Sequence, residues 1–286
     1  MVQIIKQTKA ITELVNDFRN QGYSVGLVPT MGGLHEGHLS LVRAALASHD
    51  KVIVSIYVNP TQFAEGEDLE RYPRQLDEDC AALSAVGGDI TIFAPHSLYH
   101  DNHTTMITPQ GPALMLEGVH RPHFFTGVAT VVFRLFQIVP ANAAYFGEKD
   151  FQQLAVIKQM VRDFDLPIKI TPVSTSRADD GLALSSRNSY LDKAERQVAI
   201  QLYAEMKKAA QNVKNGMAPA QSCQTAVSAL QAHGFANCDY FVWCDPQTLE
   251  EVTDVTGQSR LMAAIWLGNT RLIDNDYYDN LCSAQN

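Results

Sequence analysis

The sequence predicts an α/β protein: a Rossmann-like, doubly wound parallel sheet with a smaller C-terminal α+β domain. Two observations predict the sheet. Residues 52–58 and 90–93 are short, nearly continuous apolar runs, which are typical of strands buried on both faces. Helical patterns alternate with these runs, and repeated βα units at such short spacings favour parallel strands with right-handed crossovers.

The remaining elements follow from the same patterns along the chain. The expected strands of the sheet are residues 24–28, 52–58, 90–93, 143–146 and 168–171. The expected helices between them are residues 11–19, 39–47, 76–86, 129–139 and 151–163. After a polar loop at 174–188 come two amphipathic stretches, 193–213 and 219–234, and two apolar runs, 240–243 and 261–267. Because the pattern changes here, we expect one domain at 1–175 and a second, smaller domain at 176–286.

Composition excludes several classes of protein. The 286 residues are 46% hydrophobic and 19% charged, which is the range of globular chains. The net charge of −9 opposes nucleic acid and anionic membrane surfaces, so neither is an expected partner. The five cysteines form no C-x-x-C pair, and no apolar stretch reaches the length of a membrane-spanning helix. We therefore expect a cytoplasmic protein.

The segment richest in possible chemistry follows the strand at residues 24–28. It consists of Met31, Gly32, Gly33, Leu34, His35, Glu36, Gly37 and His38. A glycine-rich turn that opens a helix is a favourable place for an anion, because backbone amides and the helix dipole point at it. His35 and His38 are three residues apart, so both imidazoles can face one pocket. They can also be structural histidines of a turn, which remains an alternative.

Two other motifs are matched poorly by this segment. A zinc protease motif, H-E-x-x-H, needs histidines four residues apart, so we expect no metal site. The dinucleotide pattern G-x-G-x-x-G is also absent, because the glycines stand at other offsets. A nicotinamide enzyme is therefore not favoured.

Three later segments carry further polar groups. Asn59 and Gln62 follow the second buried strand and suit a hydroxylated substrate, although such residues also form ordinary turns. Lys149 stands at the start of a helix, where it can neutralise phosphate or simply belong to a solvated cap. The loop at 174–188 contains two arginines and several hydroxyl groups, so it is either a phosphate clamp or a polar linker.

Together these segments resemble the nucleotidylyltransferase superfamily, whose HIGH and KMSKS-like signatures bind ATP phosphates. More closely, the chain is similar to the pantoate–β-alanine ligase family. The similarity lies in six motifs, PTMGGLHEGHLSLV, YVNPTQF, RYPR, GVATVVFRLFQIV, YFGEKDFQQL and DGLALSSRNSYL, which cover most of residues 24–191. The remaining residues match the family's small C-terminal lid domain only in length and helical character. The resemblance therefore implies an ATP- and pantoate-binding catalytic domain at 1–175 and a lid domain at 176–286.

The resemblance implies an ATP-dependent ligase that joins pantoate to β-alanine through pantoyl adenylate and releases AMP and pyrophosphate. It implies that His35, His38 and Lys149 are catalytic and that Gln62 and Gln153 bind pantoate. The ATP-binding residues that it implies are Met31, Gly32, Gly33, Leu34, His35, Glu36, Gly37, His38, Gly147, Glu148, Lys149, Asp150, Ser176, Leu184, Ser185, Ser186 and Arg187. ATP would come with Mg²⁺, and the family resemblance implies a homodimer.

Some positions depart from the family's usual pattern or leave alternatives open. Residues 121–127 read RPHFFTG, where the family usually has Arg-Pro-Gly-His-Phe before Gly-Val, and Ser176 replaces an apolar residue. Asp77, Glu78 and Asp79 can contact Mg²⁺ indirectly, but acids in the first turn of a helix are the better interpretation. The alternative function is a cofactor-type nucleotidylyltransferase with a phosphorylated acceptor. A regulatory nucleotide-binding protein or an aminoacyl-tRNA synthetase is less favoured.

Overall fold

The computed structural model describes residues 2–283, which form two compact units. The first unit contains the chain up to Ala113, together with Arg121–Glu148 and Gln152–Ser174. The second unit contains the described chain from Thr175 onward. Two short earlier segments, Leu114–His120 and Lys149–Phe151, also group with this second unit. The boundary expected at residue 175 stays a prediction, and it did not anticipate these two segments.

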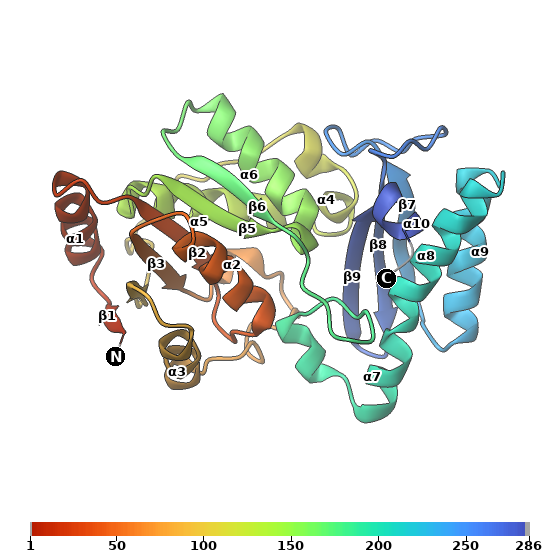
Figure 1. Cartoon of the computed structure of the whole chain (residues 1–286), viewed down its shortest axis with the longest axis horizontal. Coiled ribbons are helices and arrows are strands. Elements are labelled where there is room, and N and C mark those ends of the chain that lie inside the picture. Colours follow the sequence, from red (N-terminus) through yellow and green to blue (C-terminus); the bar gives the residue numbers. More distant parts are fainter. Residues whose placement is uncertain (1, 284–286) are drawn as a thin grey trace. The chain divides into compact units, whose positions relative to one another are not determined.

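One six-stranded sheet forms the centre of the first unit (Figure 1). Its strands are β1 (Gln3–Ile5), β2 (Val25–Thr30), β3 (Lys51–Ile56), β4 (Ile90–Phe93), β5 (Ala143–Gly147) and β6 (Lys169–Val173). All neighbours are parallel, and the order is β1-β4-β3-β2-β5-β6. From β2 the chain therefore proceeds first to one side of the sheet and later to the other. This is the doubly wound parallel topology that the sequence predicts.

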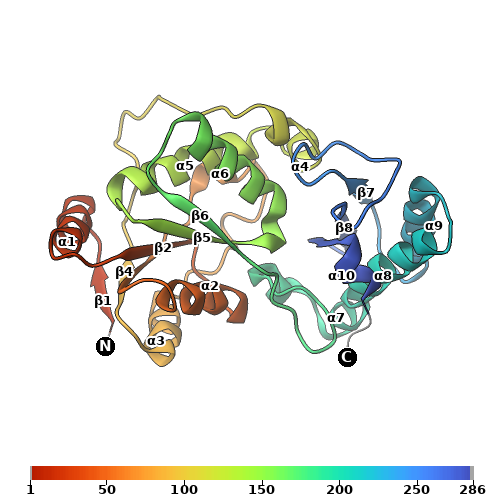
Figure 2. The same ribbon diagram turned by 45° about the horizontal axis from the view of Figure 1, so that its top comes forward.

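Helices cover both faces of this sheet (Figure 2). The helices of this part of the chain are α1 (Thr8–Asn20), α2 (Glu36–Leu46), α3 (Leu76–Val86), α5 (Phe124–Ile138) and α6 (Phe151–Asp163). α2 and α3 lie on one face, whereas α1, α5 and α6 lie on the other. Apolar side chains of α2, such as Leu41 and Val42, pack against Val52 and Val54 of β3. The strands thus lie between two helical layers, which explains their continuous apolar runs.

Short and irregular elements connect these helices and strands. They are the 3₁₀ turns η1 (Pro60–Gln62), η2 (Gly111–Leu114), η3 (Glu148–Asp150) and η4 (Ser186–Tyr190). The strand β1 is absent from the sequence prediction. It has only three residues, and all of them remain at least partly accessible to solvent, so no apolar run identifies it.

The second unit has its own antiparallel sheet, with the order β7-β8-β9. Its elements are α4 (Glu117–His120), α7 (Lys193–Ala199), α8 (Gln201–Lys214), α9 (Pro219–Ala232), β7 (Cys238–Cys244), β8 (Arg260–Leu267), β9 (Thr270–Tyr277) and α10 (Tyr278–Cys282). Trp243, Leu261 and Met206 are buried in one core that joins the sheet to α8 and α9. The α+β class of this unit was expected from the sequence.

Two details of the second unit differ from expectation. The stretch 193–213 is two helices, divided at Ile200, although Ile200 itself keeps helical backbone angles of φ −61° and ψ −23°. β9 was not predicted, because its sequence TRLIDNDY is rich in charged and polar residues. Several of those polar side chains are nevertheless buried, since they bind other parts of the same unit.

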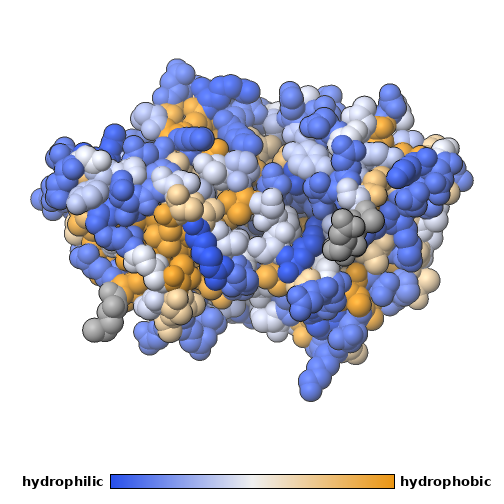
Figure 3. Space-filling view, in the orientation of Figure 1, coloured by the Kyte–Doolittle hydropathy of each residue, from blue (hydrophilic) through white to orange (hydrophobic). Residues whose placement is uncertain are grey.

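The surface is mainly polar on the face drawn in Figure 3, where apolar atoms appear in smaller groups between hydrophilic residues. Among residues 2–283, no helix is both long enough and apolar enough to cross a membrane. All five cysteines of the chain are free thiols.

Candidate active site

The candidate site of the first unit lies at β2, where the order in which the chain adds strands to the sheet reverses. β2 pairs with β3 on one side, from Val25–Lys51 to Thr30–Ile56, and with β5 on the other. Since all three strands are parallel, the turns that follow them emerge at one edge of the sheet. Ligands of open α/β sheets bind at such a switch point, beyond the carboxyl ends of the strands.

The turn after β2 requires its glycines. Gly32 and Gly33 both have positive φ angles, of 84° and 62°. A Cβ atom on Gly32 would also lie 3.0 Å from Oδ2 of Asp79 and 3.1 Å from Ile56. The Gly32 amide donates to the Thr30 hydroxyl at 3.3 Å, and that hydroxyl donates to the Ser55 carbonyl at 2.7 Å. The conformation of the turn is therefore held by its neighbours on β2 and β3.

Asp79 on α3 holds the same turn from the other side. Its carboxylate is 2% exposed and accepts hydrogen bonds from the amides of Gly33 at 3.1 Å and Leu34 at 2.8 Å. Burial raises the pKa of Asp79, and the two amide bonds, which favour the carboxylate, only partly oppose this effect. Two amides of the glycine turn thus already have an acceptor. A phosphate at this turn must be contacted mainly by other groups.

Two histidines follow this turn at the start of α2. His35 is the N-cap of α2, and its Nδ1 accepts from the amide of Gly37 at 3.1 Å. Nδ1 of His38 accepts from the amide of His35 at 3.3 Å, and the ring centroids are 4.1 Å apart. A neutral imidazole that accepts at Nδ1 carries its proton on Nε2. Both rings are therefore fixed as tautomers that donate through Nε2.

The turn after β3 holds the side-chain amide of Gln62 in one orientation. Asn59 is 1% exposed, and its Nδ2 donates to Oε1 of Gln62 at 2.9 Å and to the Gly127 carbonyl at 3.2 Å. Oδ1 of Asn59 accepts from the Tyr99 hydroxyl at 3.1 Å. Because the oxygen of Gln62 is engaged by Asn59, its NH₂ group is the end available as a donor. Sequence reasoning found Asn59 and Gln62 but missed Tyr99 and the bond between the two amides.

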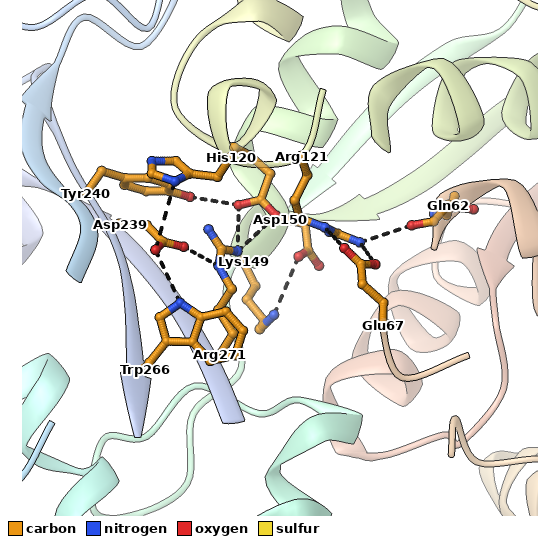
Figure 4. A network of polar contacts seen from close by, with 11 residues as sticks. Gln62, Glu67, His120, Arg121, Lys149, Asp150, Asp239, Tyr240, Trp266 and Arg271 are labelled. Carbon is orange, nitrogen blue, oxygen red and sulfur yellow. Dashed lines mark hydrogen bonds and ion pairs between the residues drawn. The ribbon is translucent and has the colours of Figure 1, made fainter. Parts of the chain in front are cut away.

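Gly127 lets α5 approach this turn closely. A Cβ atom there would lie 2.2 Å from the carbonyl oxygen of Thr61, closer than any side chain tolerates. The loop before α5, which departs from the family pattern, contributes Arg121. Its guanidinium makes two bonds to Glu67, at 2.8 and 2.6 Å, and one to the Gln62 carbonyl at 3.0 Å (Figure 4). The altered loop thus still supports the turn that carries Gln62.

The remaining predicted residues of the first unit have different surroundings. Gly147 and Glu148 stand at the end of β5, beside the end of β2 in the sheet. Gln153 lies half-buried in the first turn of α6, whereas its neighbour Gln152 is buried and donates to the Pro112 carbonyl at 2.8 Å. Glu36 is exposed and pairs with Arg43 on the surface of α2. This pairing directs Glu36 along the helix surface rather than toward the glycine turn.

The second unit carries the other predicted residues. Nζ of Lys149 lies 3.4 Å from Oδ1 of Asp150, and the side chain of Lys149 is 18% exposed (Figure 4). The Leu184 amide donates to the Ser176 carbonyl at 3.0 Å, which closes a small hairpin over residues 176–184. Arg177 anchors this hairpin through two bonds to Asp274, at 2.6 and 2.8 Å. The loop thus contains a hydrogen-bonded hairpin that is bound to Asp274 of β9, and its role as a phosphate clamp stays a prediction.

Ser185, Ser186 and Arg187 follow the hairpin at the start of η4. The Ser185 hydroxyl caps this turn by accepting from the Arg187 amide at 3.3 Å. The convergence of Lys149 and this segment with the two histidines on one phosphorus atom stays a prediction. Among residues 2–283, no three His, Cys, Asp or Glu side chains form a cluster that would hold a metal ion.

A parallel sheet with histidine donors and an oriented amide at its switch point is the construction of an α/β enzyme for anionic substrates. Comparison with known proteins identifies the family. A family model described as pantoate-beta-alanine ligase matches residues 3–277. The chain belongs to the pantoate–β-alanine ligase family.

Relatives agree with this assignment over nearly their whole length. The pantothenate synthetase of Hyphomonas neptunium is 43% identical over 281 residues, which is 96% of each chain. The pantoate–β-alanine ligase of Schizosaccharomyces pombe is 45% identical over 278 residues, covering 96% of this chain and 98% of the relative.

Solved structures agree as well. The enzyme from Thermus thermophilus superimposes with a TM-score of 0.90 at 40% identity, covering 97% of this chain and 99% of the other. A pantoate–β-alanine ligase from Francisella tularensis, in complex with β-γ ATP and β-alanine, has a TM-score of 0.83 at 33% identity and 98% coverage of both chains.

Proposed function

We propose that this chain condenses pantoate with β-alanine in an ATP-dependent reaction that passes through pantoyl adenylate. The observation that carries the proposal is the pair of imidazoles at the start of α2, both fixed to donate through Nε2. Membership of the ligase family and the ATP and β-alanine complex of the Francisella tularensis relative support it.

In the first step, a carboxylate oxygen of pantoate attacks the α-phosphorus of ATP. A P–O bond forms to pantoate, the bond to the β-phosphate oxygen breaks, and pyrophosphate leaves. Both reactants are anions, so the site must offset their repulsion before in-line attack. We assign His35 and His38 to donate to the phosphate oxygens and Lys149 to neutralise the charge that develops there.

In the second step, the neutral amine of β-alanine attacks the acyl carbon of pantoyl adenylate. A C–N bond forms, the C–O bond to the phosphate breaks, and AMP leaves while the amine loses a proton. The same donors that stabilise the first transition state stabilise AMP as the leaving group. One constellation can therefore serve both steps.

Pantoate offers a carboxylate and hydroxyl groups. We assign Gln62 and Gln153 to bind it, with the NH₂ group of Gln62 as the donor that Asn59 leaves directed to the ligand. Asn59, Tyr99 and Arg121 support Gln62 without being assigned any contact with the substrate. This arrangement makes the pantoate site more rigid than a lone glutamine on a turn.

For ATP, we assign the ribose to Gly147 and Asp150, and the adenine side and outer phosphates to Ser176 and residues 184–187. The glycine turn of residues 31–34 leads directly into His35, and two of its amides bind Asp79. Mg²⁺ would arrive with ATP and neutralise phosphate charge. The phosphates would supply most of its ligands, so the protein need contribute few or none.

The test is product analysis with the four components. The protein is incubated with Mg–ATP, pantoate and β-alanine, each is omitted in turn, and AMP, pyrophosphate and pantothenate are measured. We expect all three products only in the complete mixture. A nucleotide left attached to an acceptor, with no AMP, would instead support a cofactor-type nucleotidylyltransferase. The expected homodimer and cytoplasmic location are separate proposals, and light scattering in solution tests the dimer.

A further inference from the structure

We infer that Asn275, held in place by Arg260, is a positioning residue that fixes the backbone of Lys149. The inference rests on the proposed function, because it explains how the second unit places the lysine assigned to the phosphate. Neither residue belongs to a motif that the sequence analysis singled out. Both lie on the small antiparallel sheet, Arg260 at the start of β8 and Asn275 on β9.

The contacts form a short chain from the sheet to Lys149. Nε of Arg260 donates to Oδ1 of Asn275 at 2.6 Å, and Nδ2 of Asn275 donates to the carbonyl oxygen of Lys149 at 2.7 Å. Arg260 and Asn275 are 1% and 2% exposed. The guanidinium has no acceptor atom, so it determines which end of the carboxamide faces Lys149.

Arg260 also holds the segment at a second point. Its guanidinium carbon lies 3.8 Å from the ring centroid of Phe151 and 4.1 Å from that of Tyr277. A cation buried to this degree is costly unless hydrogen bonds and aromatic faces replace water. Lys149 and Phe151 flank Asp150 in the chain. Arg260 contacts the ring of Phe151 directly and reaches the carbonyl of Lys149 through Asn275. The carbonyl of Lys149 and the ring of Phe151 are thus fixed by one buried group.

Such anchoring matters for lysine in particular. The lysine side chain has a flexible four-carbon stem, so the position of its ammonium depends strongly on where the backbone is held. Fixing the carbonyl of Lys149 removes backbone freedom that would otherwise be lost when the phosphate binds. A displacement of about 1 Å at a catalytic group can lower turnover by about a hundredfold.

Neighbouring residues of β9 also bind other segments of the same unit. Arg271 binds Glu117 on α4 at 2.7 Å, and Asp274 binds Arg177 of the 176–184 hairpin at 2.6 Å. Those contacts hold α4 and the hairpin. Asn275 is the member of this series that binds the backbone of Lys149.

The test is the isosteric variant Asn275→Asp. Aspartate still accepts from Arg260 but cannot donate to the Lys149 carbonyl. We expect kcat for pantothenate formation to fall by about ten- to hundredfold, with the KM for pantoate nearly unchanged. In a Lys149→Ala background, the same change should lower the residual kcat by less than about threefold, because residues that act as a unit are not additive.

Asn215→Asp is the matched control, since Asn215 is exposed at the end of α8 and its side-chain oxygen, which aspartate keeps, accepts from Nε2 of Gln211 at 3.0 Å. It should behave as the wild type. If Asn275→Asp does not fold, as judged by circular dichroism, Asn275→Ser replaces it with a smaller side chain that cannot reach the carbonyl. Equal losses of kcat from the Asn275 change in the wild-type and Lys149→Ala backgrounds would overturn the inference.

Hydrogen–deuterium exchange separates this inference from the proposed function. The peptide covering residues 147–152 should exchange faster in Asn275→Asp than in the wild type or Asn215→Asp. This result does not depend on which reaction the protein catalyses. Unchanged exchange would refute the anchoring even in an active ligase, whereas absence of AMP formation by the wild type would refute the proposed function alone.

Discussion

The carboxylate of Asp79 determines the shape of the glycine turn, and the variant Asp79→Asn tests this. The two oxygens accept from separate amides, those of Gly33 and Leu34. Asparagine has one oxygen, so one amide would face an NH₂ group instead of an acceptor. At a site that is 2% exposed, an unsatisfied donor of this kind costs about 1–3 kcal/mol.

A loss of about 2 kcal/mol corresponds to a fall in Tm of about 4–8 °C for a folding unit of this size. Because the turn leads directly into His35, we also expect kcat to fall by about ten- to hundredfold. Thermal unfolding by circular dichroism measures the first effect, and AMP release measures the second.

Asp77→Asn provides the control for this experiment. Asp77 stands in the same first turn of α3 but is exposed, so the change should alter the free energy of unfolding by no more than about 0.5 kcal/mol. If Asp79→Asn matches Asp77→Asn in both Tm and kcat, the carboxylate does not hold the turn and our reasoning is wrong.

Three further outcomes are expected. His38→Ala and Lys149→Ala should each lower kcat by about 10²–10³-fold without loss of fold, since each removes a donor to the transition state; steady-state kinetics would expose an error if either variant kept near wild-type turnover. For Glu67, burial alone would raise the pKa, but the hydrogen bonds and charge of Arg121 outweigh it and leave the pKa below its ordinary value of 4.5. Folding therefore favours the carboxylate, and the stability that it contributes is present above pH 4.5 and lost as the pH falls. In urea unfolding, the difference in free energy of unfolding between the wild type and Glu67→Gln should shrink in acid. A difference that does not change with pH would contradict this. Finally, Mg–ATP should slow proteolysis within residues 174–188, and cleavage at equal rates with and without nucleotide would argue against a clamp.

The fold class could be predicted because the central strands are buried on both faces. Burial on both faces leaves no polar alternation, so runs such as residues 52–58 identify strands without any knowledge of their neighbours. The helix 76–86 and the strand 90–93 were predicted with the bounds that the structure has. β9 could not be found in this way, because its buried polar residues make sense only once their partners are known.

The candidate site shows the same division. Local sequence predicts a glycine turn, two histidines and an amide after consecutive strands, and the family motifs assign their roles. It does not show that Asp79 occupies two amides of the turn, or that the Asn59 side chain binds the oxygen of Gln62 and so leaves its NH₂ group as the donor. Leu34 and Asp79 are 45 residues apart, whereas Asn59 and Gln62 are three residues apart. Distance along the chain is therefore not the deciding factor. What decides is which groups are buried together.

The sequence by itself determined most strands of the central sheet and the helices between them, the family and the residue types available for phosphate chemistry. It did so because apolar periodicity and motif spacing are local properties of the chain. Only the tertiary structure decided the hold of Asp79 on the glycine turn and the anchoring of Lys149 by Asn275. These depend on single hydrogen bonds about 3 Å long between residues far apart in the sequence, whose partners are selected by packing rather than by sequence neighbourhood.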